Sequence, residues 1–351
     1  MHHALNDSFL RLTQNPLVFA DGSPKFVCPT AVTGDPYFTW SKNALEEVIP
    51  LLEKLFPYYE IDYAIWDTDQ LNAWICPRAA NQYVIAVSKG ALIEFVKSGN
   101  VFFQQLSAVG ITEKESALFG IFAGLPCPSG GILEGRTAEV FAVGAISAIL
   151  GHELGHAHER QFEVEESQNE PVLVNHGAEF AADFWGVRVA NRFLSGFFDI
   201  AREGAEESPY VFAADLLQAQ FVLQAFSCLD RVDLRSPWAP VDPEDIDDTH
   251  PIDAARLHFA AKGLADCLIE DNGRPQEIAE SISIMALERV LQLHQRKLLL
   301  ETANTNELAL KTLLERYDEA EQYLPRVRER YALWLNGSGA FDSADKKEKP
   351  E

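Results

Sequence analysis

The chain has 351 residues, 47% of them hydrophobic, and is therefore long enough for one large or two ordinary domains with a sizeable core. Aspartate and glutamate number 53 against 29 lysines and arginines, and the net charge of -24 argues against nucleic acid and anionic membranes as partners. The five cysteines are odd in number and never spaced C-x-x-C, which indicates neither a disulfide framework nor a cysteine zinc site and favours a reducing cytoplasm.

The first part of the chain, to about Gly110, is predicted to be α+β. The amino terminus lacks a basic start followed by an apolar stretch, so no secretory signal is expected. Apolar residues at helical spacing predict a helix at 44–55, which Pro50 could kink. Alternating and β-branched runs predict strands at 71–75 and 83–87.

From Thr137 onward the pattern is helical, and five helices are predicted, at 138–161, 177–194, 210–229, 275–301 and 306–335. Two stretches read as loops, one polar and one rich in proline and aspartate, at 165–171 and 235–248. The small and charged residues 337–351 are predicted to be disordered. The longest apolar run, 140–150, is shorter than the ~20 residues that span a bilayer, so no membrane insertion is expected.

The most informative segment is 152–156, which reads H-E-L-G-H at the end of an apolar helical run. Residues four apart return to nearly the same helix face, so His152 and His156 can reach one tetrahedral metal ion. Glu153 points beside the metal, where its carboxylate can take a proton from metal-bound water. Burying these three side chains without a partner would cost several kcal/mol, and a metal removes that cost.

A third metal ligand is available on the next predicted helix. Glu179 and Asp183 are four residues apart, so the first can bind the metal while the second orients a ligand histidine from outside. His176 is the competing third ligand. His158, two residues past His156, points to the other side of its helix and is expected to be an exposed polar residue.

This combination resembles the gluzincin family of zinc metallopeptidases, which includes the CAAX prenyl proteases and the HtpX-type membrane proteases. In that family H-E-x-x-H is followed by a helix bearing E-x-x-x-D with small residues before the aspartate, as in Glu179-Phe-Ala-Ala-Asp183. The resemblance implies a zincin-like catalytic domain with one zinc ion per chain. It also implies that Glu179 is the third ligand and that Asp183 supports a ligand histidine.

An upstream segment resembles the same family. Asn72-Ala73-Trp74, followed by residues 85–92, is similar to its N-A-aromatic motif and hydrophobic strand. In the family this strand borders the cleft, and an extended peptide can pair with such an edge through main-chain hydrogen bonds. The resemblance therefore implies that Asn72, Ala73 and Trp74 bind substrate. An ordinary core hairpin is the alternative.

A downstream segment, 249–256, resembles the family's T-H-P segment, which ends in an arginine. By that resemblance His250 lies near the zinc, where it donates to the developing oxyanion or gates the site. Arg256 is expected to bind substrate. Without the resemblance, His250 is only a loop histidine before a helix.

The sequence thus predicts an α+β fold: a mainly helical zincin-like domain at 1–260 with a small β-sheet near the N-terminal half, and a helical C-terminal region at 261–336. The expected activity is zinc-dependent hydrolysis of a protein or peptide substrate, with Glu153 as general base for a metal-activated water. The alternative is an inactive metal-binding regulator whose C-terminal helices engage a protein partner. Membrane members of the family carry transmembrane helices around these motifs, but residues 157–178 are mostly polar here, so a soluble cytoplasmic protein is expected.

Overall fold

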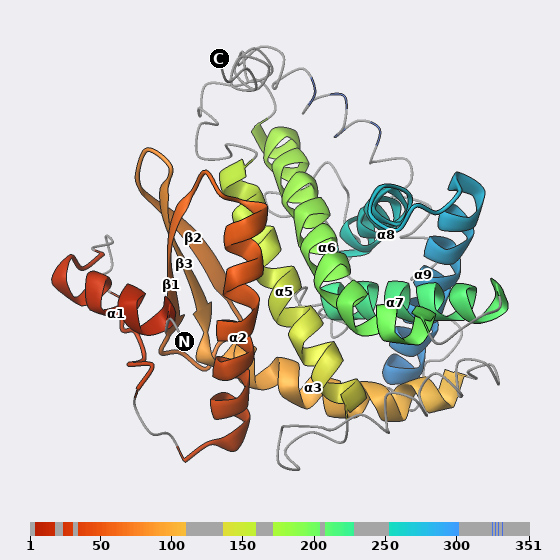
Figure 1. The fold of residues 1–351 in the computed structure, drawn as a ribbon, viewed down its shortest axis with the longest axis horizontal. Helices are drawn as coiled ribbons and strands as arrows, with labels where there is room; N and C mark the ends of the chain where they lie inside the picture. The colour runs from red at the N-terminus through yellow and green to blue at the C-terminus, as the bar shows by residue number, and fades with distance from the viewer. Residues whose placement is uncertain are drawn as a thin grey trace.

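The computed structural model describes residues 4–17, 24–30, 34–109, 136–158, 171–203, 208–227 and 253–301, and the single residues 325, 327, 329 and 332. Within them, eight helices and one three-stranded sheet confirm a mainly helical α+β fold (Figure 1). The elements in chain order are α1 (Ala4–Gln14), α2 (Pro36–Leu55), β1 (Glu60–Trp66), β2 (Ala73–Ala79), β3 (Gln82–Ser88), α3 (Lys89–Val109), α5 (Arg136–His158), α6 (Pro171–Glu203), α7 (Ser208–Ser227), α8 (Asp253–Glu270) and α9 (Gln276–Glu301).

Four of the predicted C-terminal helices are found as α5, α6, α7 and α9, although α6 begins six residues earlier than expected, at Pro171. The sequence patterns did not predict α1, β1 and α3, and they indicated α8 only as a helix after His250 without bounds. The predicted loops 165–171 and 235–248 lie outside the described residues, except that Pro171 already belongs to α6. The helix 306–335, apart from four isolated positions, and the tail also lie outside them.

The helix predicted at 44–55 is the second part of the longer α2. It begins at Pro36 because Asp35 caps it: the Asp35 carboxylate accepts hydrogen bonds from the amides of Tyr37 and Phe38 at 2.9 and 3.2 Å. Pro50 lies on the exposed side of α2 and does not end it.

The sheet has the strand order β1-β3-β2, in which β3 runs parallel to β1 and antiparallel to β2. The turn between β2 and β3 contains Asn81 at a φ of 62°, a conformation that asparagine tolerates well. One face of the sheet packs against α1 through Leu12, and the other joins the main core with α2, α3 and α5. Because β3 is central, β2 is an edge strand.

The main core is built around α5, whose side chains are buried from Ala138 to Ala157. The segment Ala138–His158 is long and apolar enough to cross a membrane, with a mean hydropathy of 1.3, so it extends beyond the apolar run that the sequence suggested. It is the one such helix among the described residues, and its whole apolar window is covered by protein. Core helices of soluble proteins share this property.

The boundary predicted after residue 260 falls inside α8. Leu257, Ala260, Ala261 and Leu264 of this helix belong to the same hydrophobic core as α5, α6 and α7. No composition change marks this packing in the sequence, because α8 is an ordinary amphipathic helix. The described part of the C-terminal region thus completes the core that holds the predicted site.

Candidate metal centre

The two helices that carry the predicted ligands, α5 and α6, lie side by side (Figure 1). Glycines on α5 allow their backbones to approach closely. A Cβ atom on Gly155 would come within 2.6 Å of the Ala182 Cα atom, and one on Gly151 within 2.7 Å of the Val189 Cβ atom. Gly151 and Gly155 each directly precede a histidine of the H-E-x-x-H motif. This spacing was the available sequence signal that the two glycines allow close helix packing.

We expect Gly155→Ala to destabilise the protein by about 1–3 kcal/mol, because the added methyl group overlaps the backbone of α6. In an ordinary helix the same change stabilises by up to about 1 kcal/mol. Gly144→Ala on α5 is the control, since its methyl group would contact only the flexible Leu194 side chain at 3.1 Å. Urea unfolding of both variants measures the difference, and a more stable Gly155→Ala protein would contradict the close approach.

Three predicted ligands converge between α5 and α6. The Nε2 atoms of His152 and His156 are 3.0 Å apart. Each faces one carboxylate oxygen of Glu179, at 3.6 Å from His152 and 3.7 Å from His156. All three side chains are buried, and they form the one group of this kind that the described residues contain.

The spacing of these donor atoms fits a tetrahedral metal ion. Two ligand atoms that each lie ~2.0–2.1 Å from a tetrahedral ion are roughly 3.3 Å apart. This separation falls within the range of the three donor distances in the group, 3.0 to 3.7 Å. Two imidazoles and one carboxylate are also a donor set that zinc takes in hydrolytic enzymes. The buried group could therefore hold a metal ion.

Asp183 lies behind His152, on the face of α6 that also carries Glu179. Its Oδ1 atom is 2.9 Å from the His152 Nδ1 atom. Burial lowers the pKa of His152, but the hydrogen bond and charge of Asp183, with the charge of Glu179, outweigh burial and raise it. Burial raises the pKa of Asp183, but the paired Arg256 and the adjacent His152 lower it to about 2. Asp183 thus remains ionised beside His152, the histidine on the neighbouring helix.

Glu153 is also buried, and it lies against the edge strand of the sheet. Burial raises its pKa to about 7, with a contribution in the same direction from Glu179. The pKa of Glu153 is lowered by the charges of His152 and Arg256 and by a hydrogen bond from the backbone of Ile75 on β2. A carboxylate with a pKa near neutrality can both accept and return a proton at physiological pH.

The residues predicted to bind substrate sit differently from the expectation. The Ser88 amide donates to the Asn72 carbonyl at 2.9 Å, so Asn72 is paired with β3. The Trp74 ring packs beside Trp66 and Phe26 on the α1 face of the sheet. Residues 85–88 cannot pair with a peptide, because they lie in β3, which already has a strand on each side, and residues 89–92 belong to α3.

Main-chain groups of β2 do face the metal centre. Because Asn72 is hydrogen-bonded to β3, the pairing alternates along the strand, and the amides of Ala73 and Ile75 point toward the other edge. The Ile75 backbone accordingly meets Glu153. Ala73 was predicted to bind substrate, whereas the sequence did not single out Ile75, whose contribution comes from its backbone.

The remaining candidates are resolved in part. His176 is buried but is not a member of the three-residue group. His158 is exposed as expected, and its ring packs against Trp185 at a centroid distance of 4.6 Å. His250 lies outside the described residues. Arg256, expected at the substrate, is instead buried with its guanidinium on Asp183, because the α6 carboxylate needs a positive partner there.

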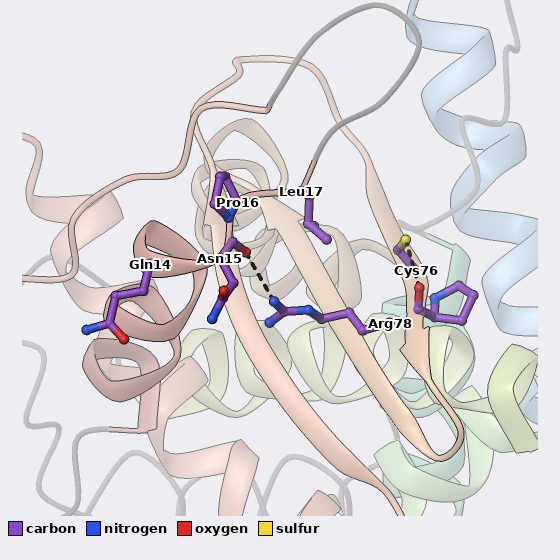
Figure 2. A pocket seen from close by; sticks show the side chains of 7 residues that line it. Gln14, Asn15, Pro16, Leu17, Cys76 and Arg78 are labelled. Carbon is purple, nitrogen blue, oxygen red and sulfur yellow. Dashed lines mark hydrogen bonds between the residues drawn. The ribbon is translucent and has the colours of Figure 1, made fainter.

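A separate pocket of about 510 Å³ lies on the α1 face of the sheet (Figure 2). It is bounded by the end of α1 and the second half of β2, and Arg78 reaches across it to donate to the Asn15 carbonyl at 3.1 Å. None of its lining residues belongs to the metal group or to the acids around it. The pocket is therefore distinct from the metal centre.

The geometry defines a buried two-histidine, one-carboxylate group with an adjacent glutamate and an edge strand beside it. Comparison with protein-family models, curated proteins and solved structures gave no match.

Proposed function

We propose that the protein is a zinc-dependent endopeptidase. The observation that carries the proposal is the position of Glu153 between the three-donor group and the edge strand β2. A purely structural zinc site needs no base, and it closes its fourth position with another protein ligand. Here the group formed by the described residues has three members, which argues against the regulator alternative.

His152, His156 and Glu179 would hold the ion. A zinc ion bound there would polarise the scissile carbonyl and lower the pKa of a water molecule. Glu153 would take the proton from the attacking water and pass it to the leaving amine, because its carboxylate lies beside the three-donor group without being one of its members. Its burial keeps competing water away from this transfer.

The proposed substrate is an extended segment of a protein or peptide. An extended chain can add to an exposed sheet edge through main-chain hydrogen bonds, which are independent of side-chain identity. The outward-facing amide of Ala73 and the carbonyl groups of Ala73 and Ile75 would provide these bonds, while the Ile75 amide donates to Glu153. Such binding places a backbone carbonyl, which is the group to be hydrolysed, next to the base.

The first test uses full-length protein purified without an affinity tag or added metal. We expect about one zinc ion per chain by elemental analysis, and cleavage of bonds in a mixed peptide library followed by mass spectrometry. A strong zinc chelator should abolish cleavage, and added zinc should restore it. One bound zinc without any cleavage would favour the regulator, and the absence of metal binding would overturn both readings.

A further inference from the structure

Arg256 belongs to a third helix, α8, yet it reaches the metal centre. Its Nε atom donates to the Asp183 Oδ2 atom at 2.9 Å, and its Nη2 atom donates to Oδ1 at 2.5 Å. The Arg256 residue is 8% exposed, and its guanidinium lies over the Phe226 ring of α7 at 5.8 Å from the centroid. Four helices therefore meet around one carboxylate.

The two hydrogen bonds from the Arg256 guanidinium fix the plane of the Asp183 carboxylate. A carboxylate turns readily about its last torsion, but two parallel hydrogen bonds to a planar guanidinium leave it one orientation. In that orientation Oδ1, which accepts from Arg256, is also 2.9 Å from the His152 Nδ1 atom. The ring of His152 then directs its Nε2 atom at His156 and Glu179.

We propose that Arg256 is a positioning residue of the metal centre, and that through it the docking of α8 is coupled to metal binding. This inference rests on the proposed metal site, which it deepens. The metal-ligand group lies on α5 and α6 alone, and α8 approaches it through Arg256, whose Nη2 atom is 4.0 Å from the Glu179 Oε2 atom. Coupling between two sites is reciprocal, so a bound metal should stabilise the docked α8 as much as docked α8 favours the metal.

The first experiment measures zinc affinity by competition with a chromophoric chelator. We expect Arg256→Ala to bind zinc about 10–100-fold more weakly than wild type, the usual effect of losing an outer partner of a ligand. Arg256→Lys should remain at least about fivefold weaker than wild type, because an ammonium group cannot hold both oxygens of Asp183. Retention of wild-type affinity by either variant would overturn the proposal.

The matched control is another arginine paired with a buried aspartate, although this arginine is only partly buried. Arg274, in the turn between α8 and α9, pairs with Asp215 of α7 at 2.6 and 3.3 Å and contacts no member of the metal group. Arg274→Ala should lower the midpoint of thermal unfolding, as Arg256→Ala does, but keep zinc affinity within about threefold of wild type. Equal losses of affinity in both variants would show a general stability effect and reject the specific role.

The second experiment needs no variant and so is independent of whether Arg256→Ala folds. In wild-type protein, zinc should slow amide hydrogen exchange across residues 253–270 and leave residues 4–14 of α1 unchanged. Unchanged exchange in α8 on zinc binding would overturn the coupling. If wild-type protein bound no zinc, the proposed function would fail as well, whereas tight zinc binding with no effect on α8 would reject the coupling alone.

Discussion

Glu153→Gln is expected to reduce kcat for peptide hydrolysis by about 10²–10⁴-fold while the protein keeps one zinc ion per chain. The amide has nearly the shape of the carboxylate but cannot accept the proton of the attacking water. Because Glu153 is not a member of the three-donor group, metal affinity should change little. Peptide cleavage and zinc content, measured on the same preparation, separate the two effects.

The same substitution should make the metal-free protein more stable above neutral pH. Burial raises the Glu153 pKa from an ordinary 4.5 to about 7, so the carboxyl group favours the folded state below about pH 4.5 and this advantage is lost as pH rises to 7. Glutamine carries no charge, so Glu153→Gln should raise the free energy of unfolding at pH 8 by up to about 3 kcal/mol and have little effect at pH 4.

Glu139→Gln is the control for both measurements. Glu139 is equally buried on α5, but fourteen residues earlier, about 20 Å along the helix. The Glu139→Gln variant should cleave peptides at the wild-type rate. If Glu153→Gln retained wild-type kcat, Glu153 would not be the base, and the peptidase mechanism in its present form would be wrong.

Local spacing explains why the ligand set could be predicted from the sequence. A helix returns to the same face after four residues, so His152 and His156, and likewise Glu179 and Asp183, each had to share a face. What spacing cannot provide is the distance between α5 and α6. That depends on Gly151 and Gly155, whose missing side chains let the two pairs meet.

The elements that were missed have identifiable causes. Strand β3 runs into α3 without a loop, so no turn signal after the predicted strand 83–87 announces the start of the helix. The Ser88 hydroxyl accepts a hydrogen bond from the Ala91 amide at 3.0 Å and caps the new helix, which is a polar signal within an apolar run. The role of Arg256 was beyond any local pattern, because its partner lies 73 residues away in the chain.

Glu179→Gln is expected to weaken zinc binding by about 10²–10³-fold. Structural zinc sites with four protein ligands bind with about 10–16 kcal/mol, so one ligand contributes roughly 3–4 kcal/mol. Glutamine preserves the size of the side chain but removes the charge that each histidine Nε2 atom faces at 3.6 and 3.7 Å. Chelator competition measures the loss, and peptide cleavage should fall with metal occupancy and recover in part at high zinc concentration.

His176→Gln decides between the two candidate third ligands. His176 is fully buried on the same helix, three residues before Glu179, but it stands outside the group in which the donor atoms converge. The His176→Gln variant should therefore bind zinc within about threefold of the wild-type affinity, even where the substitution lowers folding stability. If His176→Gln lost the metal and Glu179→Gln kept it, the third ligand would be the histidine, and Asp183 would support a site with a different donor set and one negative charge fewer.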